Sequence, residues 1–393
     1  MNDLSVTAAL AAAPFPLVAT DTGSAVAAAA GHLLPPLDRG QRIDAAMLRA
    51  AMEDAFGASD ASGAWDWKTA YDAGEAATVL FLRKYGKALL RKAGSPAAAL
   101  PMLARIASLL PTHTRRSEES ETFQQFSTPI PLGFAAATAA AITPADRVLE
   151  PSAGTGLLAI LAELSGASLV LNELAETRAG LLAHLFPTVP VTRFDAAQIN
   201  DHLDAGIVPS IVLMNPPFSA MANVSGRMAD AAYRHIASAL ARLADGGRLV
   251  AITGASFAPD APAWREAFVR LQEHGRVVFS AAVDGSVYAK HGTTIDTRLT
   301  VIDKSPADDP TVVATSRGTA PDAAALLGWV IRDMPARLPV TASTAAQATL
   351  RPAVPRTVRG YLARPRSSAP KTTVLGEPEG VDLAYETIDW QPA

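Results

Sequence analysis

Seven short apolar runs, separated by stretches with helical periodicity, are the feature that most constrains the fold of this chain. They occupy residues 147–150, 169–173, 191–194, 211–214, 248–253, 276–283 and 297–303. Strands that alternate with helices form buried parallel sheets, so we expect the first four or five runs to pair in parallel. The last two runs lie too close together for a helical crossover and should pair antiparallel. We therefore predict an α/β fold with a seven-stranded sheet, the last strand antiparallel.

The composition on either side of this region suggests a division into domains. Helical periodicity covers residues 42–57, 67–93 and 97–110, and one further helix is expected at 322–334. Residues 336–376 contain no Asp or Glu but carry seven Lys and Arg residues, which fits either a solvated tether or an arm that contacts phosphates. The predicted parts are an Ala/Pro-rich arm (1–40, loosely packed or a short helix), a small helical domain (41–118), the sheet domain (119–305) and a C-terminal extension with a basic Pro-rich linker (306–393).

The composition excludes several classes of function. The 393 residues include no cysteine, which rules out disulfides, thiolate catalysis and cysteine-ligated metal sites. The seven histidines lack the spacing of common metal motifs, so we expect no metal and interpret His235 and His291 as structural or surface residues. No apolar stretch reaches the ~18 residues of a membrane span, and no basic region precedes the Ala-rich start. We expect a soluble, cytoplasmic protein with no membrane partner.

Polar residues follow four consecutive predicted strands at their carboxyl ends, where α/β sheets bind ligands. The first strand runs into EPSAGTG (150–156), whose glycines allow a tight turn before a helix N-terminus. Glu173 ends the second strand and could accept hydrogen bonds from ribose hydroxyls, and Asp195 follows the third and could accept from an exocyclic amine. The fourth ends in NPPF (215–218), where two prolines fix the backbone. A glycine turn alone can serve packing, and an isolated Asn-Pro-Pro can be an ordinary turn; the crowding of all four disfavours coincidence.

Taken in order, these motifs resemble the S-adenosylmethionine (SAM)-dependent N6-adenine DNA methyltransferases. QQFSTP (124–129) is similar to their motif X, VLEPSAGTG (148–156) to motif I, LNE (171–173) to motif II, FDA (194–196) to motif III and NPPF to motif IV. The stretch 287–304 is similar to the hairpin that carries motif VIII. More loosely, the whole chain resembles the methylase-like N-terminal part of bacterial strawberry-notch-type methylase/helicase proteins, which would imply a helicase region or partner.

The resemblance implies a Rossmann-like methyltransferase sheet, SAM as the cofactor, DNA as the partner and a role for each matching residue. An exocyclic amine is a poor nucleophile, and two carbonyl acceptors, from Asn215 and Pro216, could free its lone pair. Pro217 adds rigidity, Phe218 should stack on the flipped base, and Tyr288 is the candidate for the opposite face. The residues expected to bind the cofactor are Thr128, Pro129, Glu150, Pro151, Ala153, Gly154, Gly156, Glu173, Asp195 and Asn215.

Two alternatives stay open at this point. A DNA methyltransferase normally reads bases with a separate domain of ~100 residues or more, and neither residues 219–228 nor the tail after 304 supplies one. The chain could therefore be a catalytically weak methyltransferase-like module that binds nucleic acid or a partner. The NPPF motif also occurs in RNA and protein-glutamine methyltransferases, which is the second alternative. No Walker A motif occurs, so a P-loop nucleotidase is excluded.

Overall fold

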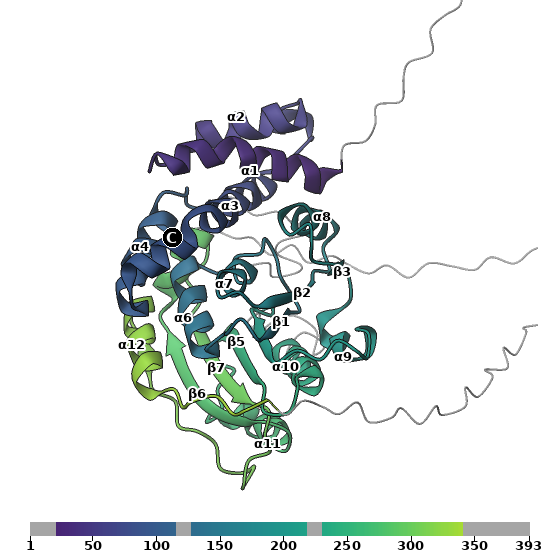
Figure 1. The fold of residues 1–393 in the computed structure, drawn as a ribbon, viewed down its shortest axis with the longest axis vertical. Coiled ribbons are helices and arrows are strands. Elements are labelled where there is room, and N and C mark those ends of the chain that lie inside the picture. Colours follow the sequence, from purple (N-terminus) through teal and green to yellow (C-terminus); the bar gives the residue numbers. More distant parts are fainter. Residues whose placement is uncertain (1–20, 115–126, 218–229, 341–393) are drawn as a thin grey trace, which may run out of the picture. The chain divides into compact units, whose positions relative to one another are not determined.

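A mixed sheet of eight strands, in the order β3-β2-β1-β4-β5-β7-β6-β8, organises the described part of the chain, residues 21–114, 127–217 and 230–340 of a computed structural model (Figure 1). The first five strands pair in parallel, as predicted. β7 runs antiparallel between β5 and β6. The strands are β1 (Arg147–Glu150), β2 (Ser168–Asn172), β3 (Val191–Thr192), β4 (Ile211–Met214), β5 (Arg248–Gly254), β6 (Arg276–Val283), β7 (Thr297–Asp303) and β8 (Thr319–Ala320).

The predicted strand number was wrong by one. β8 adds an eighth strand at the sheet edge and pairs in parallel with β6, so the sheet does not end in its antiparallel strand. β8 has two residues, too few to produce the alternation that marks a strand in a sequence. The two strands predicted to pair antiparallel, β6 and β7, do so.

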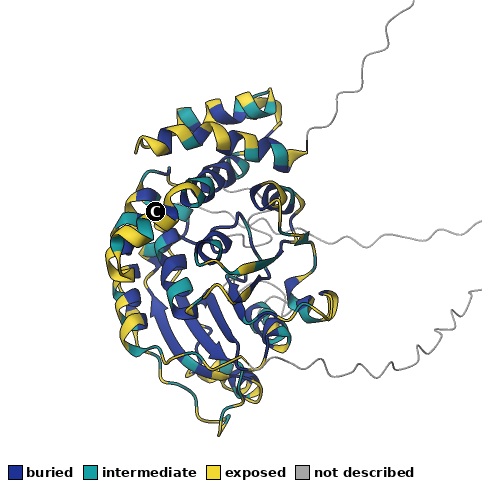
Figure 2. Cartoon of the chain, viewed as in Figure 1, coloured by how far each residue is buried: buried dark blue, intermediate teal, exposed yellow. Residues whose placement is uncertain are grey.

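Helices cover both faces of the sheet, and alternate residues along the strands point to each face. Ile211 and Leu213 of β4 belong to one apolar cluster, whereas Val212 and Met214 belong to the other. The first cluster includes residues of α6 (Ile130–Ala140), α7 (Ala159–Leu164), α8 (Glu176–Leu185) and α12 (Ala323–Asp333). The second includes residues of α9 (Ile199–His202), α10 (Ala231–Arg242) and α11 (Arg265–Gln272). Figure 2 shows that the central strands are buried, which is why they read as continuous apolar runs.

The N-terminal helices begin and end at residues suited to helix caps. Asp44 and Asp66 accept hydrogen bonds from the backbone N–H groups of Met47 and Thr69, and Gly57 and Gly94 end their helices in left-handed conformations. The N-terminal helices are α1 (Thr22–Asp38), α2 (Ala45–Phe56), α3 (Trp67–Ala93) and α4 (Pro96–Ser108). Short 3-10 turns in the described chain are η1 (Asp60–Ser62), η2 (Ala196–Gln198), η3 (Pro262–Trp264) and η4 (Gly285–His291).

Helix α1 lies within the stretch expected to be either a loose arm or a short helix, and it is a packed helix. A Cβ atom on Gly23 of α1 would lie 2.5 Å from the backbone of Gly180 in α8, so the two helices approach closely. Val26, Ala29 and Leu33 of α1 are buried. The predicted division into domains stays a prediction.

The chain returns to the base of the sheet after α12. Arg337 donates to both carboxylate oxygens of Asp146, next to the start of β1, at 2.7 and 2.9 Å. This arginine was interpreted as part of a solvated tether or a phosphate-contacting arm, and that interpretation was wrong for Arg337 because its side chain is 13% exposed and paired. The rest of the basic linker lies outside the described residues. Within the described ranges, no helix is long and apolar enough to cross a membrane.

Candidate active site

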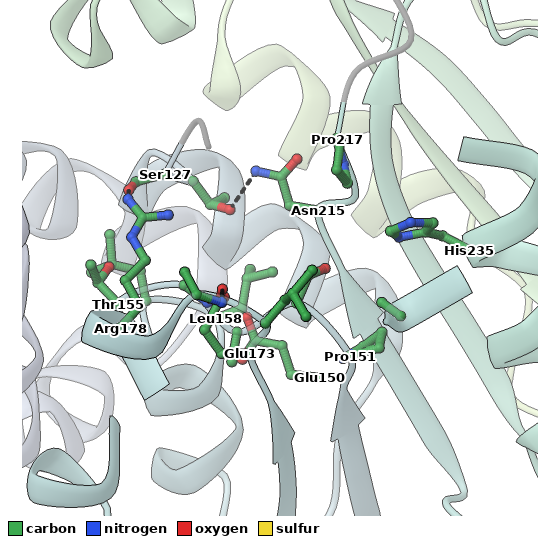
Figure 3. Close-up of a pocket in the computed structure, with 18 of the residues that line it drawn as sticks. Ser127, Glu150, Pro151, Thr155, Leu158, Glu173, Arg178, Asn215, Pro217 and His235 are labelled. Atoms are coloured by element: carbon green, nitrogen blue, oxygen red, sulfur yellow. Dashed lines mark hydrogen bonds between the residues drawn. The ribbon is translucent and has the colours of Figure 1, made fainter. Parts of the chain in front are cut away.

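A cavity of about 250 Å³ lies at the carboxyl ends of the parallel strands (Figure 3). Its lining includes Glu150 of β1, Glu173 directly after β2, Asp195 after β3 and Asn215 directly after β4. Pro151, Ala153, Gly154, Thr128 and Pro217 also line it. The structure thus brings together four polar groups that the sequence predicts at one sheet edge.

The glycine-rich turn after β1 is held by the carboxylate of Glu173. Gly154 has a φ of 57° and its backbone N–H donates to Glu173 Oε2 at 2.8 Å, while the Ala175 N–H donates to Oε1 at 2.9 Å. Each carboxylate oxygen has two lone pairs, so Glu173 keeps acceptor capacity toward the cavity.

Gly156 serves packing rather than the cavity lining. Its φ is 85°, and a Cβ atom there would lie 2.6 Å from the Phe186 ring, so the position requires glycine for two reasons. It is not among the residues that line the cavity, unlike Gly154. Its predicted contact with a cofactor stays a prediction.

Asn172, at the end of β2, joins the ends of three strands and was missed by the sequence reasoning. Its Nδ2 donates to the backbone carbonyls of Pro151 and Phe194, both at 2.9 Å. Its Oδ1 accepts from the Phe194 N–H and the Thr192 hydroxyl, both at 2.8 Å. This fully buried amide therefore fixes the spacing of Pro151, which follows Glu150, and Phe194, which precedes Asp195. The one available signal was its place beside Glu173 in the LNE motif.

Glu150 is a buried carboxyl group that faces the cavity. It is 2% exposed, and its Oε2 has no hydrogen-bond partner among the described residues. Burial raises the pKa of Glu150 well above its ordinary value of 4.5, and the negative charge of Glu173 raises it further. A positively charged ligand in this cavity would relieve both effects.

The carboxamide of Asn215 is held in one orientation. Its Nδ2 donates to Thr128 Oγ1 at 3.0 Å and to the Tyr288 hydroxyl at 3.4 Å. Figure 3 shows the carboxamide oxygen on the opposite side, near Pro217. The two prolines after Asn215 fix the backbone φ at their positions, so the backbone here is rigid. Pro216 is buried, and Pro217 is half-buried and lines the cavity.

Two other residues that were predicted to contact the substrate or the cofactor are not among the described residues that line this cavity. Phe218 lies outside the described residues. Pro129 precedes α6 and lines a different cavity, whereas its neighbour Thr128 lines this one.

Tyr288 was expected to stack on a base, and the structure contradicts this expectation. The residue is 0% exposed and belongs to the apolar core, so its ring offers no open face. Burial raises the pKa of its hydroxyl above the ordinary value, so the hydroxyl keeps its proton. Tyr288 instead positions Asn215 through that hydroxyl.

An ion pair beneath the cavity also escaped the sequence reasoning. Arg178 of α8 lines the cavity and donates to both carboxylate oxygens of Asp72 in α3, at 2.8 and 3.0 Å. Lys68 contacts the same carboxylate at 3.0 Å. Although burial raises the pKa of Asp72, the positive charges of Arg178 and Lys68 lower it overall, so Asp72 is ionised. These residues come from elements far apart in the sequence, and no local pattern links them.

His235 of α10 also lines the cavity. Burial lowers its pKa to about 4, so the ring is neutral at physiological pH. It was expected to be a structural or surface residue. Its position adds an uncharged polar group to the cavity wall.

Comparisons with known proteins give low similarity. No protein-family model and no curated protein matches the sequence. Among solved structures, one provisionally named class I SAM-dependent methyltransferase from Listeria monocytogenes matches with a TM-score of 0.44 and 13% identity, over 80% of this chain and 98% of the other. A provisionally named modification subunit of a type I restriction enzyme from Vibrio vulnificus matches with a TM-score of 0.38 and 17% identity, over 52% of this chain and 53% of the other.

A methyltransferase subunit of a type I restriction-modification system from Streptococcus thermophilus also has a TM-score of 0.38 and 17% identity, over 53% of this chain and 49% of its own. The match therefore spans about half the length of each restriction-system subunit. At these TM-scores the likeness does not identify a function, which has to come from the site.

Proposed function

We propose that this chain is a SAM-dependent methyltransferase that methylates the exocyclic N6 amine of adenine in DNA. The observation that carries the proposal is the Asn215 carboxamide. Its nitrogen is held by Thr128 and Tyr288, its oxygen lies near Pro217, and the acidic cavity begins beside it. A fixed amide acceptor at the edge of a cofactor-sized cavity suits recognition of an amine that is to be methylated.

The charges of the cavity support a cationic cofactor. Glu150, Glu173 and Asp195 line it, and Glu150 Oε2 is buried without a partner among the described residues. The described lining contains no lysine, and its arginine, Arg178, is already paired with Asp72. These groups favour the sulfonium and ammonium of SAM over the phosphates of a dinucleotide.

The residues divide between the parts of the cofactor as the motif resemblance implies. Glu173 would accept hydrogen bonds from the ribose hydroxyls and Asp195 from the adenine amine. The turn at Gly154, with Thr128, would hold the methionine end, where a bound positive charge would favour release of the Glu150 proton and so gain a negatively charged partner. When bound, SAM supplies an electrophilic methyl group.

The chain's own contribution is to orient the acceptor amine. The Asn215 side-chain carbonyl and the Pro216 backbone carbonyl would accept hydrogen bonds from the two N–H groups of the amine. These bonds draw the amine nitrogen toward a tetrahedral geometry and free its lone pair. The prolines hold both carbonyls in place. A strong base is not required, since the proton can leave after the methyl group arrives. Orientation therefore supplies most of the rate.

The choice of DNA rests on the QQFSTP motif, which is typical of the DNA enzymes, and on the basic C-terminal stretch. The test is transfer of radiolabelled methyl groups from SAM to unmethylated genomic DNA, RNA and protein, followed by nucleoside analysis of the DNA. We expect label in N6-methyladenine. Label in RNA or protein would reject the substrate class, and cofactor binding without transfer to any substrate would favour the binding-module alternative.

Variants separate the roles of the site residues. Asn215→Ala should lower turnover by roughly 100-fold or more and leave SAM binding unchanged by calorimetry. Tyr288→Phe, which removes the hydroxyl that positions Asn215, should lower kcat with little change in the KM for SAM.

Glu173→Gln should weaken SAM binding. The matched control is Glu176→Gln, whose side chain is 84% exposed and which should bind SAM as the wild type does.

A further inference from the structure

Three potential metal ligands converge beneath the glycine-rich turn, outside the cavity described above. They are Glu75 of α3, His113 after α4 and His291 at the end of η4, and their ligand atoms all lie within 4.8 Å of one another. Glu75 Oε1 is 3.8 Å from His113 Nε2 and 3.5 Å from His291 Nδ1. A tetrahedral zinc ion bound at 2.0–2.2 Å holds its ligands about 3.4 Å apart, so these spacings are close to those of a formed site.

The hydrogen bonding of the cluster leaves its inner atoms without partners. Glu75 is 0% exposed, and its Oε2 accepts a hydrogen bond from the Thr155 hydroxyl at 2.7 Å. Among the described residues, neither Glu75 Oε1 nor His291 Nδ1 has a hydrogen-bond partner. A buried carboxylate needs a counter-charge, and the nearby cations Lys68 and Arg178 are both engaged by Asp72. A bound cation would satisfy both atoms at once.

The surrounding structure holds the two histidine segments together. The His113 ring stacks on Tyr71 with centroids 4.2 Å apart, and the His113 backbone N–H donates to the Lys290 carbonyl at 2.8 Å. The Lys290 ammonium in turn donates to the carbonyls of Ala107, Ser108 and Leu110, which fixes η4 against the end of α4. Such outer contacts orient ligands in metal sites, as does the Thr155 hydrogen bond to the second oxygen of Glu75.

A second cavity gives an ion a route to the cluster. It has a volume of about 410 Å³, and both His113 and His291 line it. A three-ligand site that opens onto a cavity leaves a fourth coordination position for water or another ligand. Glu75 is not among the described residues that line this cavity, so the two histidines are the ligands exposed to it.

We propose that Glu75, His113 and His291 bind one first-row divalent cation, with zinc as the first to test. Two imidazole nitrogens and one carboxylate oxygen form a donor set suited to zinc, and cobalt can report on the same site. The ion would tie α3, the segment after α4 and η4 together. It would also join two contacts of the candidate active site, because Glu75 holds Thr155 of the glycine-rich turn and η4 carries Tyr288, which positions Asn215.

The sequence predicts no metal, because metal motifs are recognised by short spacings between ligands. His113 and His291 lie in different parts of the chain, and Glu75 lies in a helix whose periodicity reads as packing. The fold alone brings them together.

The proposal is tested with the full chain, stripped of metal with a chelator and desalted. After dialysis against zinc chloride, elemental analysis should give one tightly bound zinc per chain, and zinc should raise the thermal midpoint by several degrees. Cobalt chloride should produce the intense visible absorption of a tetrahedral ion. Glu75→Gln, His113→Gln and His291→Gln should each weaken binding at least tenfold. His32→Gln, which changes an exposed histidine of α1, should bind as wild type does.

Glu75→Gln keeps the side-chain volume and an oxygen for the Thr155 hydroxyl, so circular dichroism of the metal-free variants will show whether each one folds. If one variant fails to fold, the two others decide. Absence of stoichiometric binding by the wild type, or stoichiometric binding retained by the folded variants, would overturn the proposal. Neither readout depends on methyl transfer, so failure here and failure of the proposed function are distinguishable.

Discussion

The site depends on single polar side chains whose orientation is set by neighbours from other elements. Asn215 directly follows β4, its two hydrogen-bond acceptors come from Thr128 before α6 and from η4, and Asn172 ties the ends of β1, β2 and β3. An amide that rotated freely would present a donor and an acceptor to the substrate in turn. Two hydrogen bonds fix the nitrogen and therefore the orientation of the oxygen, which the proposed function uses as an acceptor.

Glu150 gives a prediction about stability and pH. Its raised pKa means that the folded chain keeps this proton at pH values where the unfolded chain has released it. The wild type therefore loses stability as the pH rises above 4.5, the ordinary value, toward the raised pKa of the folded state. Glu150→Gln cannot ionise and should escape this loss. Its urea midpoint should exceed that of the wild type by a margin that grows from pH 4.5 to pH 8.

The control for this prediction is Glu176→Gln, an exposed carboxylate on α8 whose removal should not alter the pH profile. A difference between Glu150→Gln and wild type that stays constant across the pH range would show that Glu150 ionises normally in the folded chain.

At the scale of elements, the long helix α3 supplies two residues that contact the lining of the candidate site, which its sequence pattern does not indicate. Its periodicity predicts a helix with an apolar face, and that is correct, but Asp72 and Glu75 lie three residues apart on the buried side. Asp72 reaches Arg178 in α8, and Glu75 reaches Thr155 in the glycine-rich turn. Buried charges of this kind are stable only when both partners are present, and the second partner is distant in the sequence.

This explains how far the sequence could predict the fold and the site. Apolar periodicity identified strands β1–β7 and most helices, since burial acts locally along each element. It missed β8, which has two residues, and left α1 undecided because an alanine-rich stretch has weak periodicity. Strand-end motifs predicted that Glu150, Glu173, Asp195 and Asn215 meet at one sheet edge, and all four line the cavity there. The partners that orient these residues, among them Arg178, required the tertiary fold.

The ion pair between α3 and α8 gives a prediction at this scale. Its side chains are 4% and 6% exposed, so Asp72→Asn leaves the Arg178 charge buried without its partner. We expect a loss of about 3–5 kcal/mol in the free energy of unfolding, measured by urea denaturation. Asp38→Asn, which breaks the more exposed pair with Lys84, should change stability little. Equal effects of the two variants would argue against the importance of the buried pair.

At the scale of the whole molecule, the segment after α12 closes the described chain onto the base of the sheet. Arg248 of β5 donates to Asp303 of β7 at 2.7 and 3.0 Å and to the carbonyls of Ala139 and Pro335. A Cβ atom on Gly246 would meet the Pro339 carbonyl, so the returning backbone packs tightly against the loop before β5. These contacts lie at the end of the strands opposite to the cavity and leave the carboxyl ends to the site.

The pair of Asp146 and Arg337 tests this closure. Although burial raises the pKa of Asp146, hydrogen bonds from Arg337, Ser210 and Thr143 lower it below its ordinary value of 3.8. Its contribution is therefore complete above that value and is lost as the pH falls toward the lowered pKa of the folded state. Asp146→Asn should lower the free energy of unfolding by about 1–3 kcal/mol at pH 7, and its urea midpoint should fall less than that of the wild type between pH 5 and pH 2.5.

The matched control is Asp308→Asn, whose carboxylate pairs with Arg276 but is 94% exposed. Because solvent screens that pair, its removal should leave both the stability at pH 7 and the acid profile unchanged. If Asp146→Asn behaved like this control, the pair of Asp146 and Arg337 would contribute nothing measurable to the stability of the sheet.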